Sequence, residues 1–120
     1  MKKDEDDIRK EYFCDLTRWQ SWLDVESALA LAQSEIEMIP SWAATVISKK
    51  SKISLINQTE LKNIIKDTGT GVFSLTKSLS NICGEAGKFV HWGATTQNIV
   101  DTGLLIVLKK YHSEMMIVIS

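Results

Sequence analysis

Proline and glycine are scarce in this chain of 120 residues, which has one Pro and six Gly. Sandwiches and barrels of short strands need many turns, and turns depend heavily on these two residue types. The scarcity therefore argues against such folds and favours helices. Apolar residues make up 44% of the chain and charged residues 24%. That composition is typical of a globular protein rather than of a disordered or fibrous one.

Cysteine and histidine are also scarce, with two residues of each type. Cys14 and Cys83 are too few for a disulfide framework. They form no close spacing with His91 or His112 of the kind that zinc sites use. The sequence therefore gives no reason to expect a metal centre.

An excess of one charge is missing as well, because fourteen Lys and Arg stand against fifteen Asp and Glu. A basic excess normally supplies most of the affinity for nucleic acid, so we expect no such partner. The first seven residues are mostly charged, unlike a signal peptide. Apolar runs such as residues 104–108 are far shorter than the roughly 20 residues of a membrane span. We therefore expect no membrane contact and a cytoplasmic location.

The hydrophobic pattern predicts an all-α fold. Residues 1–11 are polar and charged and are expected to form a mobile arm, while residues 12–120 form the helical domain. A first helix is predicted from Asp15, as its N-cap, to about Met38, because apolar residues recur at three- and four-residue steps along two adjoining seams. Two seams make a wide apolar face, so this helix should be covered on more than one side.

Four further helices are predicted after the first. Pro40 suits the first turn of the second helix, since its fixed backbone angle matches helical geometry. The predicted ranges are about 40–48, 59–66, 72–84 and 96–120, with a turn at 67–71 and a loop over 85–95. The last helix is still apolar at residue 120 and has no stop signal. We therefore expect the chain to end inside a long helix of a larger fold.

Residues 88–102 are the segment best suited to chemistry, because a loop of small residues leads there into a helix N-terminus. Such a terminus presents unpaired amides and a partial positive charge. Thr95 and Thr96 add hydroxyl groups, Gln97 adds an amide and His91 adds an imidazole. Together these groups would suit a carboxylate or a phosphate. The alternative is that one threonine is only a helix cap and that His91 is a satisfied loop residue.

Two charged residues of the first helix each have a structural and a functional interpretation. Arg18 lies one turn before Trp22, so its side chain either covers the indole or points its guanidinium at an anion. Glu26 falls on an apolar seam between Leu23 and Ala30. A carboxylate there is either paired within the structure, which is the simpler interpretation, or is a functional group with a raised pKa.

Two stretches of the sequence resemble the fumarase/aspartase superfamily. Residues 18–33, RWQSWLDVESALALAQ, followed by Met38-Ile-Pro40, resemble the first long helix of that family. Residues 91–102, HWGATTQNIVDT, resemble its first conserved active-site segment. The similarity is strongest to 3-carboxy-cis,cis-muconate cycloisomerases and adenylosuccinate lyases. It covers roughly residues 8–112 and corresponds to the first quarter or so of a typical member.

The resemblance implies the all-helical N-terminal domain of a homotetrameric enzyme that needs no metal or organic cofactor. Family members remove a proton next to a carboxylate and then eliminate or add a group. By motif position, His91 would orient a small anionic polycarboxylate substrate. Thr95, Thr96 and Gln97 would bind a substrate carboxylate, and Arg18 would lie near the substrate.

This sequence also departs from the family pattern. Asn98 stands where the family usually has Asp. Residues 71–76 contain no His, whereas adenylosuccinate lyases have one ahead of the His91 motif. That absence favours a cycloisomerase-like N-terminal fragment, with an adenylosuccinate lyase fragment as the alternative. The family's catalytic serine loop and general-acid histidine lie beyond residue 120, so we expect the chain alone to be inactive. A non-catalytic helical interaction module or a gene remnant is a further alternative.

Overall fold

The computed structural model describes residues 4–68 and 71–119, and every regular element in these ranges is a helix. The predicted all-α fold is therefore confirmed. The α-helices are α1 Glu5–Tyr12, α2 Asp15–Glu35, α3 Ser41–Lys50, α4 Gln58–Thr68, α5 Gly71–Ile82 and α6 Thr96–Ile119. Two short 3-10 helices, η1 Ile53–Leu55 and η2 Gly84–Phe89, connect them.

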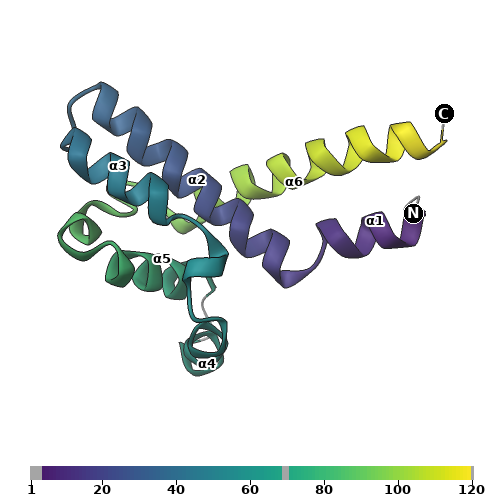
Figure 1. Cartoon of the computed structure of the whole chain (residues 1–120), viewed down its shortest axis with the longest axis horizontal. Helices are drawn as coiled ribbons and strands as arrows, with labels where there is room; N and C mark the ends of the chain where they lie inside the picture. The colour runs from purple at the N-terminus through teal and green to yellow at the C-terminus, as the bar shows by residue number, and fades with distance from the viewer. Residues whose placement is uncertain (1–3, 69–70, 120) are drawn as a thin grey trace.

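Helix α2 is the central element, and α3, α5 and α6 all pack against it (Figure 1). This arrangement agrees with its two apolar seams, since neighbours cover it on more than one side. The shared core draws on every one of these helices and on α4 and η2; its buried residues are Trp19, Trp22, Leu23, Ala30, Ile39, Ala43, Ala44, Ile47, Ile56, Leu61, Val72, Leu75, Leu79, Cys83, Ala86 and Ile99. Three polar residues of α2, namely Ser21, Glu26 and Gln33, are buried beside this core.

The ends of α2 and the start of α3 differ slightly from the prediction. The N-cap of α2 is Cys14, which makes no side-chain capping bond, so the prediction of Asp15 as the cap is wrong by one residue. The helix ends at Glu35, and Glu37 has a left-handed backbone with φ of 61°. Pro40 is the N-cap of α3 rather than part of its first turn, because its ψ of 144° is extended.

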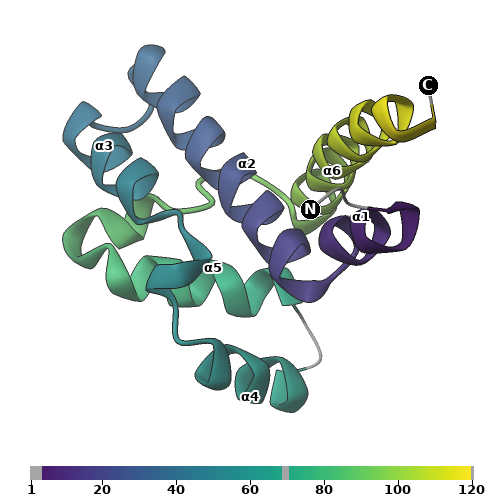
Figure 2. The same cartoon turned by 45° about the vertical axis from the view of Figure 1, so that its right-hand side comes forward.

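The segment predicted as an arm over residues 1–11 is helical from Glu5 onward (Figure 2). Asp4 caps this helix by accepting from the Asp7 amide at 2.8 Å, and the chain direction then brings α1 alongside α6. Ile8 is 1% exposed, which supplies the apolar contact that a polar arm would lack. Ile8 is therefore the one buried side chain of an otherwise charged helix.

The second half of the chain leads to the start of α6. The predicted loop over 85–95 contains η2, which packs on α3 and α5. Residues 69 and 70 of the predicted turn lie outside the described residues. Helix α6 begins at Thr96, as predicted, and crosses α2 before running beside α1 (Figures 1 and 2). Among residues 4–68 and 71–119, no helix is both long and apolar enough to cross a membrane.

Candidate functional site

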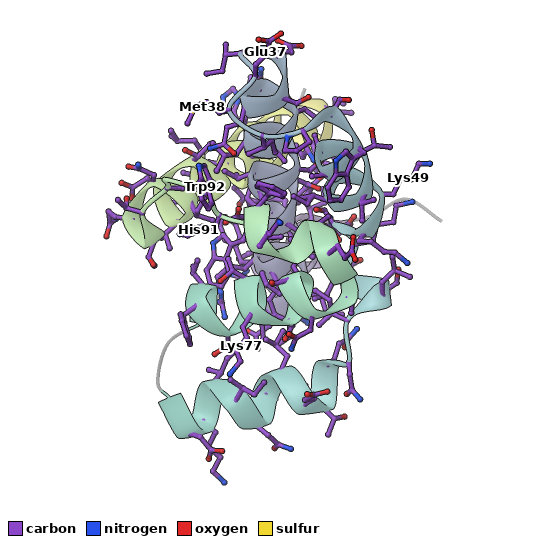
Figure 3. All side chains as sticks on the ribbon, turned by 90° about the vertical axis from the view of Figure 1, so that its left-hand side faces the viewer. Glu37, Met38, Lys49, Lys77, His91 and Trp92 are labelled. Atoms are coloured by element: carbon purple, nitrogen blue, oxygen red, sulfur yellow. The ribbon has the colours of Figure 1, made fainter. Side chains whose placement is uncertain are left out.

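His91 lies in a tight turn between η2 and α6. Its backbone is left-handed, with φ of 60°, and Gly93 follows with φ of 70°. The turn closes through the Ala94 amide, which donates to the His91 carbonyl at 3.3 Å. The side chains of His91 and Trp92 lie next to each other where this turn leaves η2 (Figure 3). The two left-handed residues explain how a short link turns the chain into α6.

The imidazole of His91 is paired with Glu26 of α2. Nδ1 of His91 lies 2.5 Å from Oε1 of Glu26, and the two side chains are 22% and 1% exposed. Burial raises the pKa of Glu26, and the hydrogen bond and charge of His91 partly offset that rise. The structure shows both the pairing of Glu26 and the raised pKa that the sequence had offered as alternatives. Its partner is the residue predicted to orient the substrate.

A second side chain of α2 holds the residue after His91. Gln33 is buried, and its Nε2 donates to the carbonyl of Trp92 at 2.5 Å. Gln33 was not among the predicted site residues, although it lies seven positions after Glu26, so both fall on the same face of the helix. Glu26 and Gln33 thus fix the turn at two successive residues.

Helix α6 begins at Thr96, five residues after His91. Oγ1 of Thr95 accepts from the Asn98 amide at 3.3 Å, which is a capping bond. The amides of Thr96 and Gln97 are in the first turn, where a helix offers no internal acceptor. Both residues are exposed. The Gln97 side chain donates to Asp101 at 2.7 Å. Among residues 4–68 and 71–119, the amides of Thr96 and Gln97 and the Thr96 hydroxyl are therefore the donors of this terminus without a partner.

Arg18 is not part of this group. Its Nη2 lies 2.7 Å from Oδ1 of Asp15, and its guanidinium carbon is 5.7 Å from the centre of the Trp22 ring. Eight residues of helix separate it from Glu26, which is about 12 Å along the axis. It lies instead at a separate apolar cavity between α1, α2 and α6. Of the two interpretations of Arg18, the structure therefore shows the one in which its side chain covers the indole of Trp22. Arg18 lies apart from His91.

Groups of three or more Cys, His, Asp or Glu that could hold a metal ion do not occur in the described part of the chain. Of the two cysteines, Cys14 is exposed and Cys83 is buried. Burial raises the pKa of the Cys83 thiol, whereas the hydrogen bond with Thr17 lowers the pKa of Cys14. Neither thiol contacts the His91 turn in any hydrogen bond that the structure shows.

Comparison with known proteins gives one consistent set of relatives. Adenylosuccinate lyase of Methanothermobacter thermautotrophicus is 41% identical over 91 residues, which is 75% of this chain and 20% of that protein. The 3-carboxy-cis,cis-muconate cycloisomerase of Pseudomonas putida is 35% identical over 104 residues, or 83% of this chain and 25% of that protein. No family model matches the sequence.

Comparison of the fold with solved structures finds the same group of enzymes. The crystal structure of a fumarate lyase from Mesorhizobium sp. BNC1 matches 88% of this chain and 25% of that chain, with a TM-score of 0.80 and 33% identity. The chain thus spans a fifth to a quarter of the length of the proteins it matches. By sequence and by fold, this chain is homologous to members of the fumarase/aspartase superfamily and has the fold of their helical N-terminal domain.

Proposed function

We propose that this chain supplies a carboxylate-binding segment to a lyase or cycloisomerase that acts on a small polycarboxylate. The reaction would be proton abstraction next to a carboxylate, followed by elimination or addition, with no metal or organic cofactor. The observation that carries this proposal is the joining of His91 to the N-terminus of α6 by one short turn. An imidazole edge and free amide donors thereby come from adjacent positions of the chain.

The chemistry of these donors suits a carboxylate. The N-terminus of a helix carries roughly half a positive charge, and its free amides point along the axis toward a ligand. The amides of Thr96 and Gln97 and the hydroxyl of Thr96 would bind the carboxylate oxygens. His91 would hydrogen-bond a second anionic group and so orient the substrate. Thr95, which caps the helix through Asn98, would act mainly by shaping the turn.

The proposed family member is a 3-carboxy-cis,cis-muconate cycloisomerase-like enzyme. This choice is supported by the absence of His from residues 71–76. Adenylosuccinate lyase is the alternative, since its relatives have similar identity to this chain. Both relatives' names describe carboxylate-bearing substrates, so the substrate class is the same in either case. A homotetramer in the cytoplasm is part of the proposal, and we expect the 120 residues alone to bind a carboxylate without turnover.

Calorimetric titration of the 120-residue chain with tricarballylate tests the proposal. We expect saturable binding with a dissociation constant of about 1 mM, which is weak because one segment alone makes the contacts. His91→Ala and Thr96→Ala should each weaken it about tenfold, the effect of losing one hydrogen bond to a charged group. Thr102→Ala, an exposed threonine farther along α6, is the matched control. Equal affinity in all four proteins would refute the proposed site.

An interaction module is the second candidate function. The observation that favours it is a set of large apolar side chains exposed on α6, namely Leu104, Leu105, Leu108 and Met116. Exposed apolar patches on a soluble protein commonly mark a surface for another protein. The two functions are compatible, because this set lies along α6 beyond its first turn and leaves the N-terminus open.

A further inference from the structure

We propose that Glu26 is a positioning residue that fixes the ring of His91 so that Nε2 faces the bound carboxylate. The inference rests on the proposed function above and deepens it. It concerns a buried residue of α2 that the predicted site did not include. Two features of the structure support it: the ring geometry and the strained turn.

The ring geometry fixes which nitrogen faces the ligand. Nδ1 of His91 is taken by Oε1 of Glu26 at 2.5 Å. The two nitrogens of an imidazole lie on different edges of the ring, so Nε2 is directed away from the carboxylate. None of the hydrogen bonds among residues 4–68 and 71–119 uses Nε2. With 22% of the side chain exposed, this edge is the part that a ligand can reach.

The strained turn explains why two residues of α2 are needed. A left-handed backbone is unfavourable for any residue with a side chain, and His91 adopts one. Glu26 holds the side chain of His91, and Gln33 holds the carbonyl of Trp92. Both contacts come from one face of α2, 65 and 59 positions away in the sequence. Helix α2 thus stabilises the turn that aims Nε2.

Nitrogen-15 NMR of the histidine side chains in the 120-residue chain tests this proposal without any ligand. His112 is exposed on α6 and serves as the internal reference, assigned by its loss in His112→Gln. For His91 we expect the signal of a strongly hydrogen-bonded Nδ1 and of an Nε2 without a partner in the protein. Glu26→Gln should move the Nδ1 signal of His91 and leave His112 unchanged. Glu35→Gln, which alters an exposed carboxylate of the same helix, should move neither signal.

Two results would overturn the proposal. One is a His91 ring whose Nδ1 shows no hydrogen bond, since Glu26 would then not hold the ring. The other is an identical His91 spectrum in the original chain and Glu26→Gln. Tricarballylate titrations separate this inference from the proposed function. We expect Glu26→Gln to weaken binding about fivefold while the melting temperature stays close to that of Glu35→Gln. Intact pairing with no binding of tricarballylate in any protein would count against the proposed function alone.

Discussion

At the scale of single residues, the approach to the His91 turn depends on Gly87 of η2. A Cβ atom on Gly87 would lie 2.2 Å from the carbonyl oxygen of Ser80 and 2.7 Å from its hydroxyl. That hydroxyl donates to the Gly87 carbonyl at 2.8 Å, which holds η2 against the end of α5. The chain reaches His91 four residues later. A residue with no side chain is therefore required for η2 to lie where it does.

Gly87→Ala should destabilise the protein, because the carbonyl oxygen of Ser80 is backbone and has little freedom to move aside. We expect a loss of about 1–3 kcal/mol in the free energy of unfolding, measured by urea denaturation, as is usual for overpacking. Glu85→Ala, an exposed position in the same 3-10 helix, should change it by less than about 0.5 kcal/mol. Equal stability of the two variants would show that η2 does not approach α5 this closely.

Individual residues also show how far the sequence alone could lead. Glu26 was recognisable as a carboxylate in need of a partner, because it lies between apolar positions of a predicted helix. Its partner could not be named, since a contact across 65 positions depends on how α2 and the turn pack together. The two interpretations of Arg18 were equally undecided until Asp15 and Trp22 were placed beside it. Local pattern identifies the residue, and tertiary packing identifies its role.

At the scale of elements, α1 docks on α6 through aromatic and apolar side chains. Tyr12 and Phe13 both contact the ring of Tyr111, with ring centres 6.2 and 5.0 Å apart. The carboxylate of Glu114 beside Tyr12, with help from burial, raises the pKa of Tyr12 to about 12. This docking could not be predicted from the sequence, because α1 is short and charged and Ile8 is its one buried residue.

Titration of tyrosine absorbance tests this docking. In Tyr111→Phe, where Tyr12 is the remaining tyrosine, we expect ionisation near pH 12, and Glu114→Gln should lower that value. The raised pKa means that the contact stabilises α1 below pH 10 and that this contribution is lost as the pH rises from 10 to 12. Circular dichroism along the same titration would report helix loss. Ionisation at the ordinary value of 10.0 in a folded protein would contradict the docking.

The longer helices were predicted from the sequence more accurately than the short ones. Regular apolar spacing identified α2, α5 and α6, and the start of α6 at Thr96 agrees with the prediction. The 3-10 helices η1 and η2 were not predicted, because three to six residues give too little periodicity to recognise. The site lies at the start of a recognisable helix, so residues 88–102 could be predicted as its location, whereas the contacts of His91 and Trp92 with α2 could not.

At the scale of the whole molecule, the chain has a covered core around α2 and an uncovered apolar surface along α6. Leu105 is 66% exposed and Leu104 50%, whereas Ile99 and Val107 of the same helix are buried. Large apolar groups on a surface favour association in water. One face of α6 therefore completes the core, and the other face is available to a partner.

This difference predicts that the 120-residue chain associates with itself. Analytical ultracentrifugation should show a species whose mass increases with concentration, because burying the exposed leucines removes apolar area from water. Leu105→Glu should shift the protein toward the monomer, and Lys109→Glu, an exposed position on the same helix, should have little effect. A chain that stays monomeric at all accessible concentrations would count against the interaction module.

Amide NMR during a tricarballylate titration shows directly whether the His91 turn and the N-terminus of α6 together bind a carboxylate. We expect saturable shifts confined to the amides of residues 91–98, with the largest at Thr96 and Gln97. The basic cluster Lys49, Lys50 and Lys52 at the end of α3 is the competing location for an anion. Shifts centred on that cluster, with the amides of Thr96 and Gln97 unmoved, would rule out this binding site.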